Sequence, residues 1–179
     1  MYYWKNRNTS RAKESRTIKY KDMEQTTMMT VGETFPQLLG VDARGEQVKR
    51  SNFPGMKLIV YFYPKDNTPG CTAEACSLRD GYAALQEAGY QVIGVSKDSE
   101  ASHRKFAEKY ALPFPLISDP DQRLCREVGV WQLKKMAGRQ YMGVVRTTFV
   151  LDRDGVVTHV ITKVNTKDAA GQLISLLGL

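Results

Sequence analysis

Cysteine is the residue type in this sequence with the most distinctive chemistry, because its thiolate is a nucleophile that also changes oxidation state. Cys71 follows a near-continuous run of β-branched and aromatic residues at 57–63 and a loop that contains Pro69 and Gly70. A helical pattern begins at Cys71. The first turn of a helix has unpaired N–H groups and the positive end of the helix dipole, so a thiol there ionises more readily. The position predicts a nucleophilic cysteine.

Cys76 lies five residues after Cys71. In an intact helix this offset places the two Cα atoms about 8 to 9 Å apart, whereas a disulfide tolerates roughly 7 Å. Two interpretations follow from this spacing. Either Cys76 only packs against its neighbours, or the two thiols form a disulfide after the first turns of the helix unwind. The residues alone leave both interpretations open.

Other chemistries fit the sequence less well. Cys125 lies inside a helical pattern, which predicts a buried core residue. The sequence contains no Cys-x-x-Cys pair, no phosphate-binding loop and no Gly-x-Ser-x-Gly elbow. His103 and His159 are not close to any cysteine in sequence, as the ligand pairs of a zinc site would be. We therefore predict no metal and no cofactor, and we expect both histidines on the surface.

The residue patterns also predict the elements that must position Cys71. Strands are expected at 57–63, 91–96 and 116–117, helices at 72–88, 99–110, 119–128 and 166–177, β-hairpins around 42–45 and 152–155, and a polar, Lys-rich loop after Trp131. Two buried strands joined by a helix require a right-handed parallel crossover. The final hairpin adds antiparallel strands. The prediction is an α/β, thioredoxin-like fold with a mixed central sheet flanked by helices and an N-terminal β-hairpin.

Length and charge limit the remaining possibilities. The chain has 179 residues, is 42% hydrophobic and carries a net charge of +7, which suits one globular domain. No apolar run reaches the roughly 18 residues of a membrane span. Three cysteines do not suit a secreted disulfide scaffold. We therefore expect a cytoplasmic protein that binds neither membranes nor nucleic acid.

More than half of the net charge lies at the N-terminus. Residues 1–27 carry seven basic and three acidic residues and almost no aliphatic ones, so this segment cannot bury enough surface to fold alone. It is predicted to be a basic, disordered extension, followed by one domain at 28–179. A start codon further along the chain and an organellar transit peptide are the alternatives.

The segment around Cys71 resembles a known active site. Pro64-x-x-x-Thr68-x-x-Cys71 is similar to the active-site pattern of the peroxiredoxins, and the stretch FYPKDNTPGCTAEAC at 62–76 looks like the peroxiredoxin Q branch, also called bacterioferritin comigratory protein. Further similar segments at 94–98, 114–119, 129–131 and 143–152 keep their order and spacing. The resemblance covers about residues 31–178.

The resemblance implies a thiol peroxidase with roles for four residues around the nucleophile. Cys71 would be the peroxidatic nucleophile that becomes a sulfenic acid. Thr68 would offer its hydroxyl to the thiolate and to the peroxide. Arg146, from a strand facing the loop, would favour the thiolate and orient the substrate. Pro64 would shield the sulfur from water. Glu74, whose position in the first turn of the helix complements the dipole, is interpreted as structural, with an arginine considered as its partner.

The resemblance also implies how the enzyme is regenerated. Cys76 would be the resolving cysteine, which forms an intrachain disulfide with Cys71 after the helix opens. Thioredoxin, or a glutaredoxin-like protein, would reduce that disulfide. The function implied is reduction of hydrogen peroxide and organic hydroperoxides in antioxidant defence, by a monomer.

Two alternatives to this reading remain. One is a peroxiredoxin that uses glutathione or a second chain for resolution, with Cys76 idle. The other is a redox sensor or holdase whose oxidation changes a partner interaction.

Overall fold

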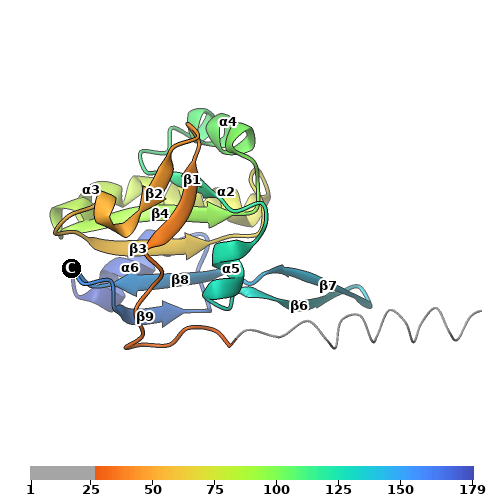
Figure 1. The fold of residues 1–179 in the computed structure, drawn as a ribbon. Coiled ribbons are helices and arrows are strands. Elements are labelled where there is room, and N and C mark those ends of the chain that lie inside the picture. The colour runs from red at the N-terminus through yellow and green to blue at the C-terminus, as the bar shows by residue number, and fades with distance from the viewer. Residues whose placement is uncertain (1–26) are drawn as a thin grey trace, which may run out of the picture.

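The computed structural model describes residues 27–179 (Figure 1). The predicted N-terminal extension therefore lies, except for Thr27, outside the described residues. In chain order the elements are β1 (Leu38–Asp42), β2 (Gln47–Lys49), a 3-10 turn (Arg50–Asn52), β3 (Lys57–Phe62), α2 (Pro69–Asp80), α3 (Tyr82–Glu87), β4 (Tyr90–Ser96), α4 (Glu100–Tyr110), β5 (Leu116–Ser118), α5 (Arg123–Glu127), β6 (Trp131–Met136), β7 (Arg139–Val144), β8 (Thr147–Leu151), β9 (Val157–Ile161) and α6 (Ala169–Leu177).

A mixed sheet of seven strands forms the centre of the described domain, in the order β2-β1-β5-β4-β3-β8-β9. β3, β4 and β5 run parallel to one another. β8 pairs antiparallel with β3, and β9 with β8. The N-terminal hairpin of β1 and β2 joins the other edge through β5. The predicted α/β fold with a mixed sheet and an N-terminal hairpin is confirmed.

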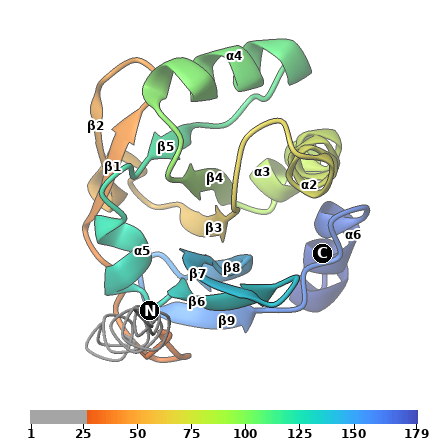
Figure 2. The ribbon, with the colours of Figure 1, turned by 90° about the vertical axis from the view of Figure 1, so that its right-hand side faces the viewer.

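Both faces of the sheet are covered, because alternate side chains of β3 point to opposite sides. Ile59 and Tyr61 pack in one core with residues of α2, α3, α4 and α6. Val60 and Phe62 pack in a second core with residues of α5. Figure 2 shows α2 and α4 on one side of the sheet and α5 on the other. The predicted position of helices on both faces is correct.

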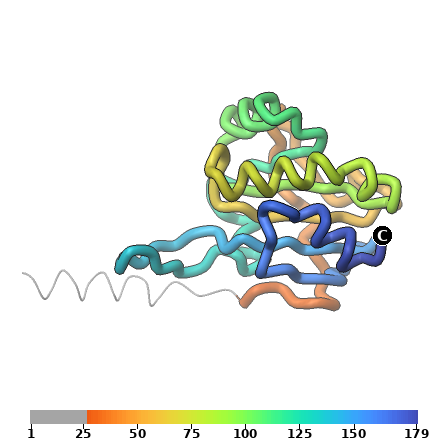
Figure 3. The backbone as a smooth tube through the Cα atoms, turned by 180° about the vertical axis from the view of Figure 1, so that it is seen from behind, coloured from red at the N-terminus to blue at the C-terminus, as the bar shows by residue number. Residues whose placement is uncertain are grey.

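The helix predicted at 72–88 is two helices, α2 and α3, separated at Gly81. A Cβ at Gly81 would lie 2.4 Å from the Cβ of Ala170 on α6, so only glycine allows α6 to approach this closely. The backbone N–H of Ala170 also donates to the Ser77 hydroxyl at 3.1 Å. Figure 3 shows α6 alongside α2. The single-helix prediction was wrong because α6 packs against the junction.

The Lys-rich loop predicted after Trp131 is a two-stranded hairpin, β6 and β7, that extends beyond the main sheet (Figure 1). Its turn places Ala137 at φ 49° and Gly138 at φ 75°, which is the left-handed pair of a tight hairpin turn. Alanine rarely takes the first of these positions, where asparagine or glycine is usual. The turn therefore has no recognisable sequence signal, and the loop prediction was wrong.

This architecture brings two segments to one end of the molecule. The loop at 63–68 and α2 follow the end of β3, and the link between β7 and β8 lies beside them because β8 pairs with β3 from Thr147 and Phe62 onward. No helix within residues 27–179 is long and apolar enough to cross a membrane.

Candidate active site

Cys71 is the third residue of α2, after Pro69 and Gly70. Thr68 is the N-cap and has an extended backbone, and proline suits the first helical position because its missing N–H would have no partner there. The Cys71 side chain is buried. The predicted placement of this thiol in the first turn of a helix is therefore confirmed, and the unpaired N–H groups of that turn lie close to it.

Arg146 supplies the positive charge beside this thiol. Its Nη2 lies 3.3 Å from the Cys71 Sγ, and its Nη1 forms an ion pair with the Glu74 Oε2. The Arg146 side chain is 22% exposed. The residue lies in the short link between β7 and β8 rather than in a strand, which corrects the predicted strand position. One guanidinium thus joins the Cys71 thiol to the Glu74 carboxyl.

Glu74, which the sequence suggested as a structural residue with an arginine partner, contacts this site through its ion pair with Arg146. Its side chain is fully buried, and its Oε1 has no hydrogen-bond partner among the described residues. Burial raises the pKa of Glu74 to about 7, and the Arg146 charge only partly opposes this. The sequence signal was its offset of three residues from Cys71, which places both side chains on one face of a helix.

Thr68 and Pro64 lie in the loop that leads to Cys71. The Thr68 hydroxyl donates to the Lys65 carbonyl at 2.9 Å, and the Thr68 carbonyl accepts the Thr72 N–H at 2.8 Å. The hydroxyl is thus bonded within its own loop rather than to the thiol. Pro64 is half-buried directly after Tyr63. The fold places Thr68 at the start of α2, whereas Pro64 lies in the loop soon after the end of β3.

The other two cysteines occupy different environments. Cys76 is half-buried in the same uninterrupted helix as Cys71, and all three cysteines are free thiols. Cys125 on α5 is completely buried in the core, as predicted. Burial, together with the nearby Asp119 carboxylate, raises the pKa of the Cys125 thiol far above its ordinary value. Cys125 therefore belongs to the core that contacts α5, whereas Cys71 belongs to the other core.

The two histidines were expected on the surface, and for His103 this was wrong. His103 is 0% exposed and contacts Asp66, a buried carboxylate in the loop between β3 and α2. His159 is partly exposed on β9. No sequence pattern marks a histidine whose partner lies 37 positions away.

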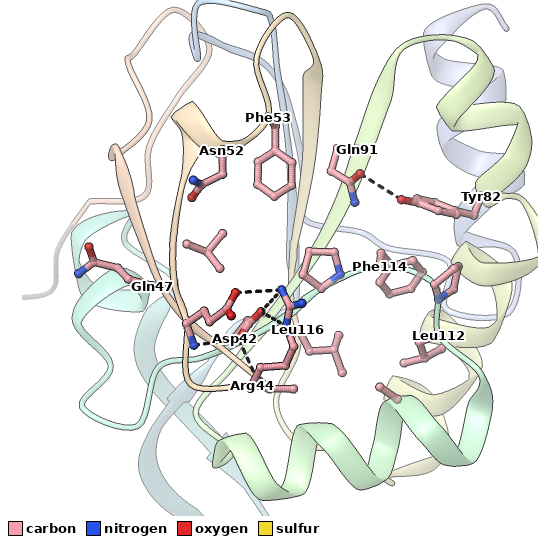
Figure 4. A pocket seen from close by; sticks show the side chains of 16 residues that line it. Asp42, Arg44, Gln47, Asn52, Phe53, Tyr82, Gln91, Leu112, Phe114 and Leu116 are labelled. Atoms are coloured by element: carbon pink, nitrogen blue, oxygen red, sulfur yellow. Dashed lines mark hydrogen bonds and ion pairs between the residues drawn. The ribbon is translucent and has the colours of Figure 1, made fainter.

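A cavity of about 610 Å³ lies elsewhere, near the amino ends of β4 and β5 (Figure 4). None of the residues that contact Arg146 lines it. Its Tyr82 hydroxyl donates to the Gln91 Oε1 at 3.1 Å. None of the three cysteines lines the cavity, which is therefore separate from the Cys71 site.

Comparison with known proteins agrees with this site. Residues 31–160 match the model of the AhpC/TSA family. The chain is 42% identical over 147 residues to peroxiredoxin Bcp of Bacillus subtilis, which covers 82% of this chain and 94% of the relative. It is 41% identical over 140 residues to peroxiredoxin Bcp of Escherichia coli, which covers 78% of this chain and 90% of the relative.

Comparison with solved structures agrees with the comparison of sequences. The bacterioferritin comigratory protein of Xanthomonas campestris matches with a TM-score of 0.74 at 35% identity, over 86% of this chain and 97% of that one. A PrxQ variant of Xylella fastidiosa matches with a TM-score of 0.77 at 29% identity, over 85% and 97%. The chain therefore belongs to the AhpC/TSA family, as a thioredoxin-fold peroxidase of the peroxiredoxin Q, or bacterioferritin comigratory protein, branch.

Proposed function

We propose that this protein reduces hydrogen peroxide and organic hydroperoxides through Cys71, resolves the oxidised cysteine with Cys76, and is regenerated by thioredoxin. The observation that carries the proposal is the Arg146 guanidinium 3.3 Å from the Cys71 sulfur. A permanent cation at this distance favours the thiolate, which is the reactive form.

In the first step the Cys71 thiolate attacks one oxygen of the peroxide. A sulfur–oxygen bond forms, the oxygen–oxygen bond breaks, and the departing oxygen takes a proton to leave as water or an alcohol. Backbone N–H groups at the start of α2 and the Arg146 guanidinium stabilise the charge on that oxygen. Thr68 would turn its hydroxyl from the Lys65 carbonyl toward the substrate. Pro64 excludes water from the sulfur.

In the second step the Cys76 thiol attacks the sulfenic acid of Cys71. A disulfide forms and water leaves, so that the two thiols have together supplied two electrons to the peroxide. Because Cys71 and Cys76 lie five residues apart in one helix, the first turns of α2 must unwind before the sulfurs can meet.

Thioredoxin would then reduce the disulfide by dithiol exchange. An intrachain resolving cysteine needs no second subunit, which supports a monomer. Three cysteines are too few and too odd in number for a secreted disulfide scaffold, which supports a cytoplasmic location. Alkyl peroxide reduction activity is described for the similar Xanthomonas campestris protein, which supports organic hydroperoxides as substrates.

The test is peroxide-dependent NADPH consumption with thioredoxin and thioredoxin reductase. The natural sequence should turn over, whereas Cys71→Ser should be inactive. Cys76→Ser should react once with peroxide and then stop. Cys125→Ser is the matched control and should keep its turnover, because this thiol is buried away from the site.

Other results of this test would contradict parts of the proposed mechanism. Full turnover by Cys71→Ser would exclude the proposed nucleophile. Thioredoxin-coupled turnover by Cys76→Ser would mean that another thiol resolves the sulfenic acid. A protein that oxidises at Cys71 but shows no turnover with any thiol reductant would be a redox sensor.

A further inference from the structure

A buried polar cluster joins the active-site loop to α4. At its centre is Asp66, which is 5% exposed. Its carboxylate accepts hydrogen bonds from the Tyr63 hydroxyl at 2.7 Å, the Ser102 hydroxyl at 2.7 Å and the His103 Nδ1 at 2.9 Å. These donors come from the end of β3 and from α4, so the loop is joined to an element that belongs to no part of the catalytic site.

His103 completes the cluster. Its Nε2 lies 3.1 Å from the Ile117 carbonyl oxygen, an atom that can only accept a hydrogen bond. Its Nδ1 lies 2.9 Å from the Asp66 carboxylate. Both ring nitrogens therefore face oxygen atoms of the protein, and the buried imidazole links the loop to β5.

The backbone of the loop is held as well. The Asp66 N–H donates to the Asp98 Oδ2 at 2.8 Å, and the same oxygen accepts the Ser96 hydroxyl at 2.7 Å. Asp98 lies between β4 and α4. Both the side chain and the main chain of Asp66 are therefore anchored two residues before Thr68, the N-cap of α2.

We propose that this cluster, formed by Tyr63, Asp66, Asp98, Ser102 and His103, is a latch that holds the start of α2 closed and sets how fast Cys71 and Cys76 form a disulfide. The inference rests on the proposed function, in which α2 must unwind for resolution. Asp66 cannot keep all these hydrogen bonds while the loop that carries it moves. Breaking the latch therefore accelerates disulfide formation, and Asp66 and His103 are positioning residues rather than catalytic ones.

The test separates the two oxidation steps. Reduced protein is mixed rapidly with hydrogen peroxide and quenched, and mass spectrometry follows the Cys71 sulfenic acid and the Cys71–Cys76 disulfide. In Asp66→Asn the first-order rate of disulfide formation should rise about tenfold, the factor that one hydrogen bond to a charged group supplies. Ser102→Ala, a milder change, should raise it about threefold. The second-order rate of peroxide attack should not rise in either variant.

Asp119→Asn is the matched control. Asp119 is also 5% exposed, and its carboxylate accepts the N–H groups of Leu124 and Cys125 at the start of α5 rather than any group of the loop. The control removes an equally buried carboxylate charge. Any change in its rate of disulfide formation therefore measures the effect of general destabilisation. The latch is excluded if the variants at Asp66 and Ser102 form the disulfide no faster than Asp119→Asn.

A second measurement does not depend on the peroxidase reaction. Amide hydrogen exchange of the reduced proteins reports opening of α2 directly. Residues 69–76 should exchange about tenfold faster in Asp66→Asn than in Asp119→Asn. Equal exchange in the two variants would overturn the latch even if the enzyme turns over as proposed. Faster exchange without any Cys71–Cys76 disulfide would support the latch and refute Cys76 as the resolving residue.

Discussion

Arg146 is the residue that combines the separate parts of the site, because one guanidinium contacts two acidic groups. It lies against the Cys71 sulfur and forms an ion pair with Glu74. When both groups are ionised, they compete for the same positive charge. When Glu74 is protonated and neutral, the positive charge of Arg146 acts on Cys71 alone. The protonation of Glu74, whose pKa is about 7, thus affects the reactivity of Cys71.

Glu74→Gln should therefore change the pH dependence of Cys71 reactivity. At about pH 5.5 Glu74 is protonated and resembles glutamine, so the two proteins should react alike with iodoacetamide. At about pH 8.5 the variant should react about fivefold faster, because it lacks the competing carboxylate. The rate of Cys71 alkylation across this range checks the prediction. The same ratio at both pH values would contradict it.

Cys125 shows the opposite case, a thiol that the fold makes inert. It is completely buried, and its pKa lies far above the ordinary value. Iodoacetamide should label Cys125 in urea but not in the folded protein. Cys125→Ala should keep thioredoxin-coupled turnover within about twofold and lower the free energy of unfolding by about 1 kcal/mol. A peptide map that shows a Cys71–Cys125 disulfide would give Cys125 a role instead.

At the scale of elements, the junction of α2 and α3 fixes the far end of the catalytic helix. Gly81 separates the two helices and lets α6 approach, since an added Cβ would meet the Ala170 Cβ at 2.4 Å. The Ser77 hydroxyl on α2 also accepts a hydrogen bond from the Ala170 N–H of α6. The helix whose first turn unwinds in the proposed resolution step is thus anchored at its last turn.

Gly81→Ala should accordingly destabilise the protein by roughly 1 to 3 kcal/mol, the cost of forcing a methyl group into a packed contact. Ala170→Gly removes the methyl group with which the methyl group added at position 81 would collide. The double variant should therefore be more stable than the sum of the two single changes predicts. Urea denaturation of the four proteins measures this coupling. Strict additivity would show that the two positions do not interact.

At the scale of the whole molecule, buried polar groups join the layers in addition to apolar packing. Asp66 connects the loop after β3 to α4, and His103 continues this connection to β5 through the Ile117 carbonyl. Burial alone would raise the pKa of Asp66, but hydrogen bonds from His103, Ser102 and Tyr63 outweigh it and hold this pKa below its ordinary value. The cluster therefore stabilises the fold only while Asp66 is ionised.

This dependence predicts a loss of stability in acid. The pKa of Asp66 is lower in the folded protein than in the unfolded chain, where it is about 3.9. The folded protein therefore binds this proton less tightly. The contribution of the Asp66 carboxylate to the free energy of unfolding is thus complete above about pH 4. It is lost as the pH falls through the lower pKa that Asp66 has in the folded protein. Urea denaturation between about pH 7 and pH 2.5 should show that Asp66→Asn is less stable than the natural sequence at neutral pH and that the difference shrinks below pH 4. A constant difference would contradict this account.

Local patterns identified most of the elements correctly. The β-branched and aromatic runs marked β3 and β4, and the helix expected at 99–110 is α4, which Ser99 caps by accepting the Ser102 N–H. The prediction failed where a residue's environment depends on distant partners. His103 and Asp66 are polar residues that resemble surface residues in sequence, yet they are buried because each satisfies the other across 37 positions.

The sequence by itself determined that Cys71 lies in the first turn of α2, because proline, a short loop and a helix start are local signals. Its resemblance to the peroxiredoxins pointed to Thr68, Cys76 and Arg146. Only the tertiary structure decided that Arg146, 75 positions after Cys71, reaches that sulfur while also pairing with Glu74. The physical reason is that β8 pairs with β3, and strand pairing between distant segments depends on the whole sheet rather than on any local pattern.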